Sequence, residues 1–306
     1  MPGILALLPW PDPDHLPGGL PPAVQTHFFD GTGEPGPDVL DAVDFYVLPY
    51  SFEARHIELA SRMPRLRVVQ TLTAGYEHLS GKVPAGVMLC NAAGVHDAAT
   101  SELAVGLILA RLRGIDDAAR DVTAALWNHR TYRGLADARV LILGFGGVGQ
   151  AVARRLAGFE VEVVPVAHSA RTGVHGVTEL PDLLPDADVV VIAVPLTEDT
   201  VRLVDAAFLA RMRPGALLVN VARGRVVDTD ALLAALNSGH VQAALDVTDP
   251  EPLPADHRLW SAPNLLITPH VGGNTAAFPP RGRALAAAQL RRYAAREPLA
   301  NVIIDA

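Results

Sequence analysis

The chain has 306 residues, of which 50% are hydrophobic and 19% are charged, and its formal net charge is -8. This length favours two domains, because single hydrophobic cores stop growing at about 250–300 residues. The acidic balance and the lack of a clustered basic stripe argue against nucleic acid as a partner. No apolar run reaches the roughly 18 residues of a membrane helix, so we expect no membrane contact and a cytoplasmic protein.

The first third of the sequence predicts a small α/β unit. Its N-terminus is apolar but short and lacks a basic region, so we interpret it as a strand and not as a signal peptide. Cys90 is the only cysteine; it is interpreted as a buried hydrophobe, and no disulfide and no metal site are expected. The predicted elements are strands over 4–8, 43–49, 66–71 and 87–91, a proline-rich connection over 9–22 and a helix over 53–62.

A strongly apolar helix is predicted over 100–110, with Thr100 as its cap, and it leads into the second domain. The following segment, 118–132, has a less regular pattern and is interpreted as an arm or loop. Trp127 lies in this segment. It either crosses a dimer interface or is buried within its own subunit, and a homodimer is expected.

A glycine-rich turn stands at the centre of the chain. The apolar residues 140–143 lead into Gly144-x-Gly146-x-x-Gly149, and an amphipathic run follows. This order of strand, turn and helix predicts a dinucleotide site: Gly144 permits the sharp turn, Gly146 lets the backbone approach a pyrophosphate, and Gly149 lets the helix pack on the strand. Gly147 and Val148 belong to the same site. The pyrophosphate would lie on the N–H groups and positive dipole end of the helix.

Alternating strands and helices continue after this turn. Near-continuous Val, Ile and Leu runs predict a parallel sheet covered on both faces, which is a doubly wound fold. Strands are predicted over 161–166, 189–194, 216–221, 241–244 and 265–267, with helices over 206–212 and 229–238. A last helix over 281–296 is expected to pack back on the first domain. We therefore predict a domain formed by residues 1–95 and 276–306, and a dinucleotide-binding domain over 96–275.

Three chemically capable side chains follow predicted strands of the second domain. Arg223, Asp246 and His270 come just after the strands that end near 221, 244 and 267. Ligands of doubly wound sheets bind beyond the carboxyl ends of the strands. These residues are therefore expected to face one crevice, together with the glycine turn.

The motifs at these strand ends resemble those of the D-isomer-specific 2-hydroxyacid dehydrogenases, and most of all the glyoxylate/hydroxypyruvate reductase branch. The matching blocks are 218–228, 243–247 with Glu251-Pro252-Leu253, and 264–273, joined by 73–77 and 194–197. The resemblance implies two Rossmann-like domains, of which the smaller, flavodoxin-like one binds substrate. It also implies reduction of a small 2-oxo acid to the D-2-hydroxy acid with a nicotinamide cofactor.

The catalytic roles of this family fall on Arg223, Glu251 and His270. Hydride transfer to a 2-oxo carbon builds charge on the carbonyl oxygen; a histidine can protonate that oxygen, and a neighbouring carboxylate stabilises the charged imidazole. Arg223 would hold the substrate by charge-assisted hydrogen bonds, with backbone N–H groups near Ala74 and Gly75 as a second clamp on the carboxylate. Tyr50 either reaches the substrate side chain or packs within its loop.

The remaining cofactor positions indicate NADP(H) over NAD(H). NAD-binding members usually place an acidic residue about 20 positions past the turn, and Ala167 stands there in this chain. His168, Ser169 and Arg171 could bind a 2′-phosphate instead, although Arg171 could also be an exposed loop residue. Further positions that match the cofactor lining are Val194, Pro195, Thr200, Val221, Ala222 and Asp246; for Asp246 a turn cap is the alternative.

Two other functions remain open at this point. The chain could be a phosphoglycerate dehydrogenase-like member of the same family. It could also be a non-catalytic dinucleotide-sensing protein, because such relatives can keep the same three catalytic residues. Turnover of a 2-oxo acid discriminates the second of these from an enzyme.

Overall fold

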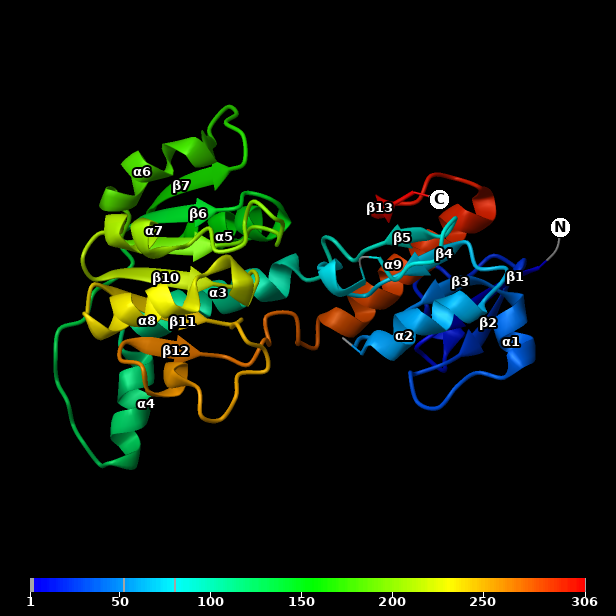
Figure 1. Cartoon of the computed structure of the whole chain (residues 1–306), viewed down its shortest axis with the longest axis horizontal. Coiled ribbons are helices and arrows are strands. Elements are labelled where there is room, and N and C mark those ends of the chain that lie inside the picture. The colour runs from blue at the N-terminus through cyan, green and yellow to red at the C-terminus, as the bar shows by residue number, and fades with distance from the viewer. Residues whose placement is uncertain (1–2, 52, 80, 306) are drawn as a thin grey trace. The chain divides into compact units, whose positions relative to one another are not determined.

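The computed structural model describes residues 3–51, 53–79 and 81–305. It divides into two compact units (Figure 1). Unit 1 comprises Met1–His96 and Ala276–Ala306, and unit 2 comprises Asp97–Thr275. No helix within the described ranges is long and apolar enough to cross a membrane.

Unit 1 is an α/β layer structure around a six-stranded sheet. The strand order is β13-β5-β4-β3-β1-β2, in which all neighbours pair parallel except the edge strand β13. Without β13 this is the flavodoxin-like order 2-1-3-4-5. The elements are β1 (Ile4–Leu8), β2 (Val24–Phe28), α1 (Pro37–Ala42), β3 (Val43–Val47), α2 (Ala54–Glu58), β4 (Val68–Gln70), β5 (Met88–Cys90), α9 (Phe278–Ala295) and β13 (Val302–Ile304).

Side chains of alternate residues fill the two faces of this sheet. Tyr46 packs on one face with Ile57 of α2, whereas Phe45 packs on the other with Ala286 and Leu290 of α9. Helix α9, from the C-terminal segment of unit 1, therefore contributes to the core on this face of the sheet.

Unit 2 is a doubly wound sheet of seven strands. All its neighbouring strands pair parallel, in the order β12-β11-β10-β9-β6-β7-β8. The elements are α3 (Asp97–Leu112), α4 (Ile115–Thr123), β6 (Arg139–Leu143), α5 (Gly147–Leu156), β7 (Glu162–Ala167), β8 (His175–Gly176), α6 (Leu180–Leu183), β9 (Val189–Ile192), α7 (Ala206–Arg211), β10 (Ala216–Asn220), α8 (Thr229–Asn237), β11 (Val241–Leu245) and β12 (Leu265–Ile267).

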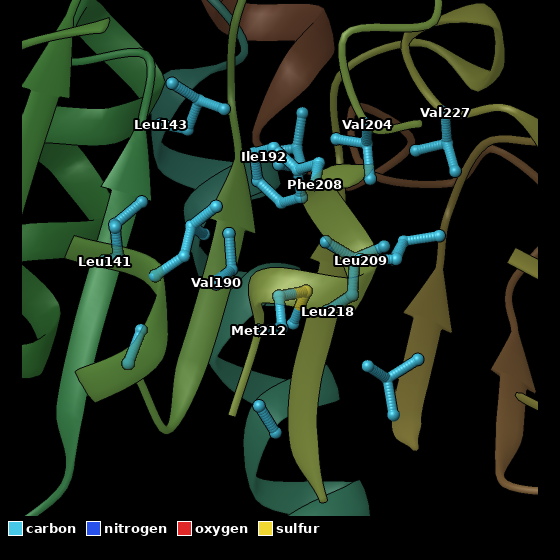
Figure 2. Close-up of a cluster of buried hydrophobic side chains, with 14 of the residues drawn as sticks. Leu141, Leu143, Val190, Ile192, Val204, Phe208, Leu209, Met212, Leu218 and Val227 are labelled. Atoms are coloured by element: carbon cyan, nitrogen blue, oxygen red, sulfur yellow. The ribbon is translucent and has the colours of Figure 1, made fainter. Parts of the chain in front are cut away.

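The apolar strands of unit 2 bury both faces of the sheet. Leu141 and Leu143 of β6 point to the face covered by α7, where they meet Phe208 and Leu209 (Figure 2). Val140 and Ile142, which alternate with these two leucines, belong to the core on the opposite face, beside α3 and α5. The burial of both faces explains why these strands consist mainly of apolar residues, and it confirms the predicted doubly wound fold.

Several predicted boundaries were wrong for local reasons. Helix α3 begins at Asp97, three residues before the predicted cap Thr100. Helix α9 begins at Phe278, because Pro279 and Pro280 fall in its first turn, where a missing N–H costs no hydrogen bond. Part of the irregular segment 118–132 is helical, as the end of α4. The sequence also did not predict β2, α1 or β13, each of which is short or largely exposed.

Candidate active site

The parallel sheet of unit 2 collects the candidate residues at one edge. Because all seven strands run in the same direction, their carboxyl ends share that edge. The glycine turn follows β6, Val194 and Pro195 follow β9, and His168 follows β7. The remaining loops, after β10, β11 and β12, carry the catalytic candidates. Chain order reverses between β6 and β9, and this switch point is where such sheets bind ligands.

The geometry of the three glycines is compatible with the roles predicted from the sequence. Gly144 has a φ of +102°, and a Cβ there would come 2.5 Å from the backbone of Ala193. A Cβ on Gly149 would overlap the Gly144 carbonyl oxygen, so only glycine lets α5 approach β6 this closely. A Cβ on Gly146, in contrast, would have no atom within 4 Å. The backbone of Gly146 is therefore open to a ligand group, and the turn fits the pyrophosphate of a dinucleotide.

The loop after β9 forms the other side of the switch point. Thr200 donates its hydroxyl to the Pro195 carbonyl at 2.7 Å and accepts the Thr197 N–H at 2.7 Å. Its side chain therefore closes this loop. Val194 is half-buried and packs on the core of the sheet, whereas Pro195 is exposed. Contact of these residues with the cofactor stays a prediction.

Residues 168–171 form an exposed segment at the end of β7. His168, Ser169 and Arg171 are all exposed. Arg171 donates from a guanidinium nitrogen to the Phe145 carbonyl at 3.1 Å, and its backbone pairs with Val174 in a tight turn. The guanidinium therefore lies beside the glycine turn, within unit 2. This is where a positive charge could meet a phosphate of a dinucleotide.

A buried asparagine shapes the loop that carries Arg223. Asn220, the last residue of β10, is 1% exposed; its amide donates to the Arg223 carbonyl at 2.9 Å and accepts the Ala222 N–H at 3.0 Å. Arg223 itself is half-buried, and its guanidinium donates to the Ala222 carbonyl at 2.7 Å. Val221 and Ala222 are buried under this loop. Arg225 is exposed, in agreement with its interpretation as a surface residue.

The loop that carries His270 is organised by Asp246, the first residue after β11. The Asp246 carboxylate is buried and accepts three hydrogen bonds, from the N–H groups of Val271 at 2.9 Å and Gly272 at 2.8 Å and from the Thr268 hydroxyl at 2.6 Å. The His270 N–H donates to the Asp246 carbonyl at 2.8 Å. His270 has a φ of +52°, an unusual conformation for a residue with a Cβ. The Asp246 carboxylate thus holds the turn around His270, as its alternative interpretation describes, and its contact with a cofactor stays a prediction.

His270 and Glu251 form a direct pair. The Nδ1 atom of His270 is hydrogen-bonded to Oε1 of Glu251. The imidazole is 29% exposed and the carboxylate 38% exposed, so both groups are partly accessible to solvent. Because Nδ1 contacts the carboxylate, proton exchange of this ring with a substrate would have to use Nε2. This arrangement suits a general acid and base.

Unit 1 contains the two predicted positions for the substrate carboxylate. The loop after β4 is held by Asn91, whose amide donates to the Ala74 carbonyl at 2.7 Å, and by Thr73, whose hydroxyl donates to the Gly75 carbonyl at 2.7 Å. In a trans peptide the C=O and N–H groups point in opposite directions. The Gly75 N–H, which shares a peptide with the Ala74 carbonyl, therefore points away from Asn91. This orientation suits a backbone donor for an anion.

Tyr50 lies in an aromatic cluster of unit 1. Its ring is 4.2 Å from that of Phe278 and 5.7 Å from that of His96, between centroids. Burial raises the pKa of the Tyr50 hydroxyl. Tyr50 also lines a cavity of about 270 Å³ together with Leu72 and His56. Both interpretations of Tyr50, packing and substrate contact, are compatible with this position.

Sequence reasoning missed the polar residues that hold the catalytic loops. Asn220, Thr268 and Asn91 had no assigned role, although each supports a loop with a predicted functional residue. The available signal was position: Asn220 and Asn91 stand at the ends of apolar strands, where a polar side chain is unusual. Such residues satisfy the backbone where strand pairing stops.

Comparisons with known proteins agree with this geometry. The family model for the D-isomer specific 2-hydroxyacid dehydrogenase, NAD binding domain, matches residues 105–272. A glyoxylate reductase of Thermofilum pendens is 35% identical over 248 residues, which cover 76% of this chain and 73% of that protein.

Solved structures agree over nearly the whole chain. A D-isomer specific 2-hydroxyacid dehydrogenase family protein from Aeromonas salmonicida superposes with a TM-score of 0.87 at 29% identity, over 99% of both chains. An NADPH-dependent glyoxylate/hydroxypyruvate reductase from Sinorhizobium meliloti, in complex with NADP and sulfate, gives a TM-score of 0.81 at 26% identity over 98% of both chains. The chain is thus an oxidoreductase with a nicotinamide dinucleotide cofactor, and it belongs to the D-isomer specific 2-hydroxyacid dehydrogenase family, in its glyoxylate reductase-like branch.

Proposed function

We propose that this protein reduces a small 2-oxo acid of the glyoxylate or hydroxypyruvate type to the D-2-hydroxy acid, with NADPH as the favoured reductant. The observation that carries the proposal is the His270–Glu251 pair, at the same sheet edge as the glycine turn. A paired imidazole at this edge is the group that reduction of a carbonyl requires. Relatives named as glyoxylate reductases support the choice of substrate.

The residues of the chain divide the work of the reaction among them. The cofactor supplies the hydride. His270 protonates the carbonyl oxygen from Nε2, and Glu251 stabilises the imidazolium form before the proton leaves. Arg223 holds the substrate by charge-assisted hydrogen bonds, and the Gly75 N–H is the second donor for its carboxylate. In the oxidative direction, neutral His270 accepts the hydroxyl proton.

The preference for NADPH rests on residues 168–171. No carboxylate stands at the end of β7, where one would repel a 2′-phosphate. The Arg171 guanidinium lies beside the glycine turn, and His168 and Ser169 are exposed next to it. The structure of the S. meliloti reductase, which is 26% identical, contains NADP.

A cytoplasmic location stays a prediction of the sequence.

A homodimer is proposed from the surface of α4 and the segment that follows it. Trp127 is 96% exposed and Val122 is 77% exposed, so burial of Trp127 within its own subunit is wrong. On the same segment, Ile115 is 57% exposed and Leu126 is 56% exposed. A concentration of large exposed apolar side chains is typical of an interface. A second copy of the chain is the proposed partner of this surface.

The test is a steady-state assay on purified protein. NADPH and NADH are each offered with glyoxylate, hydroxypyruvate, pyruvate and phenylpyruvate, and nicotinamide absorbance is followed. Oxidation of NADPH ahead of NADH, with a small acid as the best substrate, supports the proposal. Tight cofactor binding without turnover of any acid would contradict it in favour of a dinucleotide-sensing role, and preference for a phosphorylated acid would favour the phosphoglycerate dehydrogenase-like alternative.

A further inference from the structure

An acidic side chain from a neighbouring helix lies against the start of the dinucleotide helix. Asp97 is the first residue of α3, and Gly147 is the first residue of α5, which packs beside it. A Cβ on Gly147 would overlap one Asp97 carboxylate oxygen and would lie 2.8 Å from the carboxylate carbon and 3.0 Å from the other oxygen. The Asp97 carboxylate is therefore in contact with the first turn of α5.

Helix α5 has no negative group of its own at this end. Its N-cap is Gly146, which offers no side chain, and its first turn contains no acidic residue. The N-terminus of a helix carries a partial positive charge that a nearby anion stabilises by about 0.3–1 kcal/mol. Asp97 supplies this anion from α3. In the cofactor-free protein, its carboxylate compensates the same positive end that a pyrophosphate would use.

We propose that Asp97 sets the affinity of the protein for its dinucleotide, by stabilising the cofactor-free turn and repelling the bound pyrophosphate. The proposal rests on the proposed function, in which the pyrophosphate lies over Gly146, where the structure leaves the backbone open. The Asp97 carboxylate and a pyrophosphate cannot both be fully stabilised by the N-terminus of α5, because two anions at one helix end repel each other. Asp97 therefore weakens binding and favours release of the cofactor.

The test compares Asp97→Asn with the wild type. NADPH binding is measured by fluorescence titration, and thermal unfolding is measured without cofactor. We expect the variant to bind NADPH about tenfold more tightly, which corresponds to ~1.4 kcal/mol. We expect its cofactor-free melting temperature to fall by about 2 °C, because the helix end loses its anion. Glu102→Gln is the matched control, since it removes an exposed carboxylate from the same helix and should change the affinity less than about twofold.

Salt dependence separates repulsion from a change in packing. If charge is the cause, the affinity difference between wild type and Asp97→Asn shrinks as ionic strength rises from low salt to about 1 M. A salt-independent difference, unchanged affinity or weaker binding by Asp97→Asn would overturn the inference and leave the proposed function standing. Absence of NADPH binding by the wild type would overturn both.

Discussion

Removal of the Asp246 carboxylate should uncouple the His270 loop from the sheet. This carboxylate accepts both N–H groups that follow His270 and the hydroxyl of Thr268. Asp246 is only 2% exposed at the end of β11, so water could replace its carboxylate only if the surrounding loop rearranged. Asp246→Ala leaves these donors without an acceptor, and it releases the backbone that holds His270 at a φ of +52°.

The size of the effect follows from the number of donors. A buried N–H left without a partner costs about 1–3 kcal/mol. The Gly272 amide is buried and counts in full, whereas Val271 and Thr268 are half-buried and can reach water in part. We therefore expect Asp246→Ala to lower the free energy of unfolding of unit 2 by about 3 kcal/mol. A misplaced His270 should lower kcat about 100-fold, because errors of ~1 Å in a catalytic group have effects of this size.

Urea denaturation and steady-state kinetics with glyoxylate measure the two effects. Asp205→Ala is the control, because Asp205 also accepts a backbone N–H, that of Phe208 at 2.8 Å, but caps α7 from an exposed position. It should cost about 1 kcal/mol and leave kcat unchanged. An Asp246→Ala protein that keeps wild-type kcat would refute the conclusion that this carboxylate positions His270.

Three further predictions concern other parts of the chain. Burial raises the pKa of the Cys90 thiol to about 11. Between about pH 9 and 11 only the unfolded protein loses the thiol proton, so the free energy of unfolding falls as the pH rises through this range. The urea midpoints of wild type and Cys90→Ala should therefore converge between these pH values. Arg171→Ala should lower kcat/KM for NADPH about tenfold and leave that for NADH unchanged, as one lost phosphate contact predicts; equal losses with both cofactors would contradict the phosphate role. Trp127→Asp should shift the protein from dimer to monomer in light scattering, and an unchanged mass would exclude this surface as the interface.

The fold was predictable where burial dominates the sequence. Strands such as β9 and β10 are buried throughout, and their Val, Ile and Leu runs leave no alternative interpretation. Strand β2 was missed because it lies at a sheet edge, where polar residues such as Gln25 and His27 are exposed and interrupt the apolar pattern. Strand β13 lies at the other edge of this sheet and was missed because its apolar run is only three residues long. Edge strands are specified by pairing with a distant neighbour, which local patterns do not show.

The site was predictable in part by topology and in part only by resemblance. Arg223 and His270 each stand three residues after the end of a strand, so the parallel sheet alone places them at one edge. Glu251 lies in a loop after β11 and 19 residues before His270, and nothing local indicates that the two side chains meet. The contact of Asp97 with α5 is a further example, because it joins helices about 50 residues apart.

In both sheets, a buried polar side chain at a strand end holds the loop that carries a predicted functional group. Asn91, Asn220 and Asp246 stand at or just after the ends of strands, and all are at least 94% buried. Each side chain binds the backbone of a loop that carries a predicted functional group: the Ala74–Gly75 peptide, Arg223 and His270 respectively. A strand end leaves backbone groups without partners, and a buried polar side chain satisfies them in only one geometry. These side chains thereby anchor to the rigid sheet loops that have no strand pairing of their own. Function in this fold therefore depends also on polar residues, such as Asn91 and Asn220, to which the proposed mechanism assigns no contact with substrate or cofactor, and substitutions at Asn220 should lower activity through Arg223.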